Sequence, residues 1–163
     1  DMFETVMKAG PLAKEPCVNV KVRLMDCTLH EDAIHRGPAQ MYPAVREGIR
    51  GAMMQAGPLL YEPLQVTRIE VPNEYVGEIS KLVSSKRGQL LEMNQEGDVN
   101  VIIAKLPVGE LFGWSNALRS GTGGRGSSSL VDQSFEVLPR ELQDKIRAQI
   151  VERKGLTAGN LGA

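Results

Sequence analysis

A repeated change of hydrophobic period between residues 62 and 137 constrains the fold of this chain more than any other feature of its sequence. Leu64–Val71 reads as a strand with Val66 and Ile69 among its apolar residues, and residues 74–86 then carry apolar side chains at helical spacing. Two further apolar stretches, 90–93 and 99–106, have the composition of strands. The segment therefore predicts a strand, a helix and a pair of strands in that order.

The rest of this segment extends the same pattern. Gly97 lies between the two paired strands and can supply the positive φ of a hairpin turn. A short helix at about 109–119, with Phe112 and Trp114 expected in the core, leads to a last strand at about 130–137. In that strand, Val131, Phe135 and Val137 are expected to occupy alternate positions. The complete order is β-α-β-β-α-β, which predicts an α+β, ferredoxin-like domain.

The residues before this domain have a different organisation. Residues 1–16 give no clear element, whereas the alternation in 17–25 predicts a half-buried strand. A polar loop at 29–38 follows, and then a helix from about Ala39 to Ala56, where Pro43 is expected to be tolerated in the first turn. Beyond the ferredoxin-like segment, Pro139 is expected to open a final amphipathic helix.

Composition excludes several classes of protein. The net charge is −1, so any contact with nucleic acid must come from local patches. No Gly-x-x-x-x-Gly-Lys-Ser/Thr phosphate loop occurs, and no apolar run approaches the length of a membrane span. Cys17 and Cys27 are ten residues apart in and just after the predicted strand, where a disulfide would require a sharp reversal, so we expect reduced thiols and a cytoplasmic protein.

Two motifs resemble functional sites. The stretch GTGGRG at 121–126 matches a dinucleotide-binding fingerprint in letters, but a predicted helix precedes it and a strand follows, the reverse of what that site needs. We interpret it as a flexible connection whose backbone N–H groups and Arg125 remain able to touch RNA phosphates.

The second motif is the run from His30 to His35. The two histidines are five positions apart, whereas the zincin motif needs a separation of four on one helix face. A solvated loop with Asp32 capping local N–H groups is the alternative that we favour over a metal site.

The stretch LHEDAIHRGPAQ at 29–40 resembles the tip of domain IV of the archaeal and eukaryotic elongation factor 2 family, the GTP-driven ribosomal translocases. The Gly-Pro-Ala-Gln ending resembles the archaeal members. Four later stretches, 59–72, 86–98, 106–126 and 152–156, resemble domain V and the C-terminal helix of the same family.

The resemblance implies a domain organisation. Residues 1–61 would be the C-terminal half of domain IV, of the ribosomal protein S5 domain 2-like fold, and 62–137 would be domain V. Residues 138–163 would be a helix and tail that return to domain IV. The chain would then be the C-terminal part of a longer GTPase. It would have no catalytic activity and no cofactor of its own, with GTP and Mg²⁺ bound by the parent protein.

The resemblance also implies sites and partners. His35 is expected to carry diphthamide, a modification built on histidine by dedicated enzymes. Candidate contacts to RNA or the ribosome are His30, Asp32, His35, Arg36, Lys86, Arg87 and Arg125. The partners implied are ribosomal RNA, the tRNA–mRNA duplex of the decoding region, the stalk base of the large subunit and the diphthamide-synthesis enzymes. No membrane partner is expected.

Three further expectations stay open at this point. The 17–25 strand lacks partners in the sequence, so its edge is expected to allow dimerisation. A free-standing RNA-binding α+β protein is one alternative to the translocase. A small metal-dependent hydrolase using His30, Asp32 and His35 is the other.

Overall fold

A computed structural model of the chain describes residues 1–161 and divides it into two compact units. One unit contains residues 1–60 together with the chain from Pro139, and the other contains Tyr61–Leu138. No helix within residues 1–161 has the length and the apolar composition needed to cross a bilayer.

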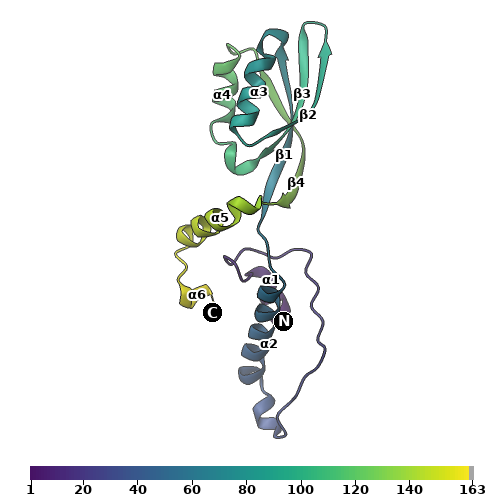
Figure 1. The fold of residues 1–163 in the computed structure, drawn as a ribbon. Coiled ribbons are helices and arrows are strands. Elements are labelled where there is room, and N and C mark those ends of the chain that lie inside the picture. Colours follow the sequence, from purple (N-terminus) through teal and green to yellow (C-terminus); the bar gives the residue numbers. More distant parts are fainter. Residues whose placement is uncertain (162–163) are drawn as a thin grey trace. The chain divides into compact units, whose positions relative to one another are not determined.

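The Tyr61–Leu138 unit is a four-stranded antiparallel sheet with two helices on one face (Figure 1). The strands stand in the order β2-β3-β1-β4, the order of a ferredoxin-like fold. The main elements along the chain are β1 (Tyr61–Pro72), α3 (Val76–Ser85), β2 (Gln89–Glu96), β3 (Val99–Pro107), α4 (Trp114–Gly121) and β4 (Ser127–Val137). Single 3₁₀ turns, η2 (Asn73–Tyr75) and η3 (Val108–Glu110), precede the two helices. The α+β class and the β-α-β-β-α-β order predicted from the sequence are confirmed.

The core of this unit lies between the helices and the sheet. Alternate residues of the central strands β1 and β3 point towards α3 and α4, as the register Ile69↔Ile102 requires. The buried cluster comprises Ile69, Val71, Ile79, Val83, Ile102, Ala104, Leu106, Trp114 and Leu118. It is built almost entirely from branched aliphatic side chains, as the low aromatic content demands.

One detail of the predicted core is wrong, and the alternating apolar residues of the last strand are exposed. Phe112 is 87% exposed, because α4 begins only at Trp114, after Gly113 adopts a left-handed φ of +74°. Phe135 is 70% exposed and Val137 44%, although both lie in β4 as predicted. Phe135 is paired with Pro63 near the start of β1, away from the Ile69–Ile102 region that carries the buried core.

The other unit is helical. It contains α1 (Met2–Lys8), the 3₁₀ turn η1 (Ala33–Arg36), α2 (Pro38–Gln55), α5 (Arg140–Arg153) and α6 (Ala158–Leu161). A small core joins α1 to α2 through Val6, Ile49 and Met53. The side chain of Gln143 in α5 holds the backbone of Leu60 by two hydrogen bonds of 2.8 and 3.0 Å.

The middle and the C-terminal end of α5 are held to the turn that follows α1. Arg147 Nε donates to the carbonyl of Leu12 at 3.1 Å, and Lys154 Nζ donates to the carbonyls of Ala13 and Lys14. Lys154 also pairs with Glu15 at 2.7 Å. Lys154 is the C-cap of α5, where its positive charge also complements the helix dipole.

Two predictions for the helical unit are corrected. Residues 17–25 form no strand: a strand needs a hydrogen-bonded neighbour, and within residues 1–161 none lies beside this segment. Only Cys17 and Val20 pack against the small core, while Val18 and Leu24 are exposed. Pro43 lies inside α2 and beyond its first turn, because the helix already begins at Pro38.

Candidate functional site

The polar loop that precedes α2 is fully exposed and nevertheless ordered by its own hydrogen bonds. Every residue from Glu31 to Arg36 is exposed. Asp32 caps the turn η1, because its Oδ1 accepts a hydrogen bond from the N–H of Ile34 at 3.0 Å. The N–H of His35 donates to the carbonyl of Asp32 at 3.2 Å. Asp32 is therefore the local cap that the sequence suggested.

Arg36 spans this loop. Its Nε donates to the carbonyl of His30 at 2.6 Å, and one terminal nitrogen donates to the carbonyl of Glu31 at 2.7 Å. Two of its five donors are thus engaged within the loop. As a candidate RNA contact, Arg36 keeps its charge exposed but has a structural task as well.

The two histidines of the chain lie against each other. Their ring centroids are 4.6 Å apart and the rings are inclined by 66°, an edge-to-face contact. Nδ1 of His30 accepts a hydrogen bond from the N–H of Asp32 at 3.0 Å. His35 has no side-chain hydrogen bond within residues 1–161, so both its nitrogens remain available to a partner.

This geometry does not favour a metal site. Within residues 1–161, no group of three His, Cys, Asp or Glu side chains is arranged to hold a metal ion. Nδ1 of His30 and one oxygen of Asp32 already bond to backbone N–H groups. In the proposed hydrolase set, His30 would have to give up its Nδ1 bond and change tautomer to coordinate a metal through Nε2, while Asp32 would offer its second oxygen.

Lys86 and Arg87, the basic candidates after α3, contact their own unit. Two nitrogens of Arg87 donate to Glu62 at 3.2 and 2.9 Å, and its Nε donates to Glu110 at 3.1 Å. The hydrogen bonds to Glu62 are the main reason why the pKa of Arg87 lies above its ordinary value. Lys86 donates to the carbonyl of Phe112 at 3.2 Å. Arg87 thus links β1 to η3.

The glycine-rich segment 121–126 is a hydrogen-bonded turn, in which most backbone N–H groups already have partners within the unit. The N–H of Gly124 donates to Arg119, that of Arg125 to Thr122, and that of Gly126 to the hydroxyl of Thr122. These donors are consequently not free for a phosphate.

Arg125 also has partners in its own unit. Its guanidinium pairs with the carboxylate of Glu74 and donates to the Tyr75 hydroxyl at 2.6 Å. The carbon at its centre lies 4.8 Å from the centroid of the Tyr75 ring. The hydrogen bond to Tyr75 is the first cause of the raised pKa of Arg125.

Thr122 is a key residue of the turn that sequence reasoning missed. Its side chain is fully buried, its hydroxyl donates to the carbonyl of Leu118 at 2.7 Å, and the same oxygen accepts from Gly126 at 2.8 Å. A Cβ on Gly126 would come within 2.8 Å of that oxygen, so glycine is required for the close approach. A threonine followed by glycines at the end of a helix is the sequence signal that could have found it.

Replacing Thr122 by valine is expected to lower the free energy of unfolding of the Tyr61–Leu138 unit by about 1–3 kcal/mol. Valine keeps the shape but leaves the Gly126 N–H without its acceptor. Urea unfolding followed by the fluorescence of the single tryptophan, Trp114, measures the change. Thr122→Ser retains the hydroxyl and is the control. Equal stabilities for the valine and wild-type chains would contradict the role of the hydroxyl.

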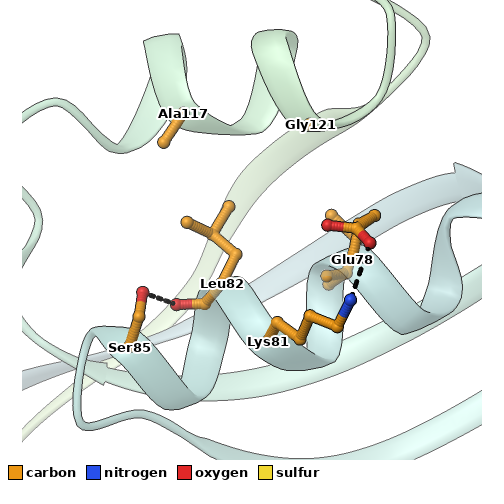
Figure 2. Close-up of a pocket in the computed structure, with 7 residues that line it drawn as sticks. Glu78, Lys81, Leu82, Ser85, Ala117 and Gly121 are labelled. Atoms are coloured by element: carbon orange, nitrogen blue, oxygen red, sulfur yellow. Dashed lines mark hydrogen bonds and ion pairs between the residues drawn. The ribbon is translucent and has the colours of Figure 1, made fainter.

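An open groove of about 250 Å³ separates α3 from α4 (Figure 2). Leu82 and Ala117 line it, and the small residue Gly121 extends it along α4. Lys81 and Glu78 pair with each other at 3.0 Å on the α3 side (Figure 2). The four-residue spacing of Ala117 and Gly121 is the sequence signal for this groove, because it places two small residues on one helix face.

Comparison with protein families gives two matches that together cover most of the chain. Residues 1–57 match the family described as elongation factor G, domain IV, and residues 59–146 match the family described as elongation factor G C-terminus.

Individual relatives agree with the family matches. Elongation factor 2 of Methanocaldococcus jannaschii is 53% identical over 154 residues, and that of Pyrococcus furiosus is 53% identical over 156. These alignments cover 94% and 96% of this chain, which spans 21% of the length of either relative. A crystal structure of a protein from Thermus thermophilus superposes with a TM-score of 0.76 at 27% identity, over 93% of this chain and 23% of that one.

Proposed function

This chain belongs to the elongation factor G and elongation factor 2 family of translation factors, and we propose that it works on the ribosome in the translocation of tRNA and mRNA. In this proposal the loop around His35 enters the decoding region and contacts the tRNA–mRNA duplex. The Tyr61–Leu138 unit has a positioning role near the stalk base and the RNA of the large subunit. We assign no GTP or Mg²⁺ site to these residues, since the sequence has no phosphate loop.

One observation carries the proposal for the loop. His35 stands on a hydrogen-bonded turn in which every residue is exposed, and its imidazole nitrogens are free of bonds within residues 1–161. An enzyme that modifies a side chain needs such access, and so does a side chain that contacts RNA. His30, by contrast, uses Nδ1 in a local hydrogen bond. We therefore propose His35, in its Ile-His-Arg-Gly context, as the residue that carries diphthamide.

The chemistry of that modification suits an RNA contact. Diphthamide adds a long arm with a quaternary ammonium group and an amide to the imidazole. The ammonium group keeps its charge at every pH, which attracts phosphate, and the amide both donates and accepts hydrogen bonds to ribose and phosphate. In the longer factor, nucleotide hydrolysis would belong to residues outside this sequence.

Expression in an archaeal or eukaryotic host is expected to add the mass of diphthamide to the peptide that contains His35. Expression in a bacterium, which lacks the pathway, should leave that peptide unmodified. Peptide mass spectrometry with fragment-ion localisation separates His35 from His30, the other histidine of the chain.

His35→Ala and His30→Ala are the matched variants for this test. The first should abolish the added mass, whereas the second should leave some of it on His35. A mass shift located on His30, with His35 unmodified, would reject the assignment.

A further inference from the structure

We propose that Arg36 and His30 are positioning residues, which together hold the His35 imidazole in one orientation for the partners of the loop. This inference rests on the proposed function of His35. It assigns Arg36 a task in addition to any phosphate contact, because two of its five donors bond to the backbone of its own loop.

The first support is the closure of the loop by Arg36. The guanidinium donates through Nε and one terminal nitrogen to two successive carbonyls, those of His30 and Glu31, at 2.6 and 2.7 Å. The planar fork of arginine suits two adjacent acceptors, whereas the single ammonium of lysine does not reproduce that geometry. Since Arg36 directly follows His35, this contact ties the backbone beside the functional imidazole to the opposite side of the loop.

The second support is the way in which His30 is fixed. Its own carbonyl accepts from Arg36 while its Nδ1 accepts from the N–H of Asp32 at 3.0 Å. Both its backbone and its ring are consequently tied to the turn that carries His35. The ring then lies edge-to-face against His35 with 4.6 Å between the centroids.

Together these contacts pre-orient an exposed side chain. An unrestrained loop would lose conformational entropy when it binds an enzyme or RNA, and a loop that is already closed loses less. One side of the His35 ring is occupied by His30, so partners approach from the remaining sides. The loop thus fixes the direction in which His35 and any group built on it extend.

Nuclear magnetic resonance on the whole 163-residue chain tests the positioning directly. The wild-type chain is expected to show a cross-relaxation peak between the ring protons of its two histidines. Arg36→Lys keeps the charge but loses the fork, so the peak should weaken at least about threefold. Arg23→Lys, a matched change in the exposed segment before the loop, should leave it unchanged. The thermal midpoint should be the same in all three proteins, because the loop contributes nothing to either core.

The second part of the test measures modification of the chain in an archaeal or eukaryotic host. The fraction of chains modified at His35 under limiting enzyme is expected to fall at least about fivefold in Arg36→Lys and to stay unchanged in Arg23→Lys. A ring-to-ring peak of wild-type strength in Arg36→Lys would overturn the proposal, and so would a lost peak with normal modification. If wild-type His35 remains unmodified while Arg36→Lys loses the peak, the positioning by Arg36 stands and the proposed function fails.

Discussion

Replacing Gly88 by alanine is expected to lower the free energy of unfolding of the Tyr61–Leu138 unit by about 2–3 kcal/mol. Gly88 follows α3 and its N–H donates to the carbonyl of Val83 at 2.8 Å. An added Cβ would overlap the Cδ2 atom of Leu106 and lie 2.8 Å from Cγ1 of Val83 and 2.9 Å from its carbonyl oxygen. Such contacts force the surrounding side chains or the backbone to move.

The neighbours of Gly88 have little room to move. Leu106 is fully buried and Val83 is 1% exposed, and both belong to the main core. Packed interiors are close to crystal density, so a shift of either side chain disturbs further contacts. Because a domain of this size is stable by only about 5–10 kcal/mol, the loss is a large part of the total.

Gly77 provides the matched control. It lies in α3, and an added Cβ there would meet no atom within 4 Å. Gly77→Ala should therefore raise the stability by about 0.5–1 kcal/mol through the higher helix propensity of alanine. Urea unfolding, followed by Trp114 fluorescence, distinguishes the two outcomes. A Gly88→Ala chain within about 0.5 kcal/mol of wild type would contradict the close packing at this position.

The Tyr61–Leu138 unit could be predicted from the sequence because each of its predicted strands and helices packs against another element of the same segment. Ile69 and Ile102 lie in two segments that the sequence predicts as strands, and both are buried where β1 and β3 pair with each other. What could not be predicted was the position of side chains near element ends. Because Gly113 adopts a positive φ, α4 begins only at Trp114 and Phe112 is left exposed. The spacing of apolar residues does not predict where a helix begins.

The candidate loop was located by its sequence, but its internal geometry was not predictable. The Ile-His-Arg-Gly context identifies His35, and the polar composition predicts exposure, which the structure has. The hydrogen bonds from Arg36 to His30 and Glu31 depend on a turn that brings residues five and six positions apart together. From the sequence, the charge and the fork of donors of Arg36 suggested a contact to RNA rather than to backbone carbonyls.

Residues 17–25 show the limit of pattern reading most clearly. Alternation predicts which face of a strand is apolar, but pairing requires a second strand. Within residues 1–161 no backbone–backbone hydrogen bond involves residues 18–29. The predicted dimer through this edge has an electrostatic cost, because antiparallel self-pairing about Val22 would place Lys21 opposite Arg23. Dimerisation stays a prediction.

Trypsin is expected to cleave after Lys21 and Arg23 before it cleaves after Arg68, with rates that differ on the order of 100-fold or more. A protease cleaves most readily where the chain is exposed and its backbone can adopt an extended, unpaired conformation in the active site. Residues 21–29 are all exposed, and residues 18–29 have no backbone partner within residues 1–161, so cleavage there requires no unfolding. Arg68 pairs with Ile103 on one side and Ser129 on the other.

Cleavage after Arg68 consequently requires the sheet to open, and the rate is reduced by the small population of opened molecules. Peptide mass spectrometry over a time course should show a resistant product that contains Tyr61–Leu138. The same digestion in urea, above the unfolding transition, is the control: there the rates should converge, because only the local sequence preference of the protease remains. Cleavage after Arg68 as early as after Lys21 in native buffer would mean that the sheet is no more stable than the extended segment, and the packing described for its core would then be wrong.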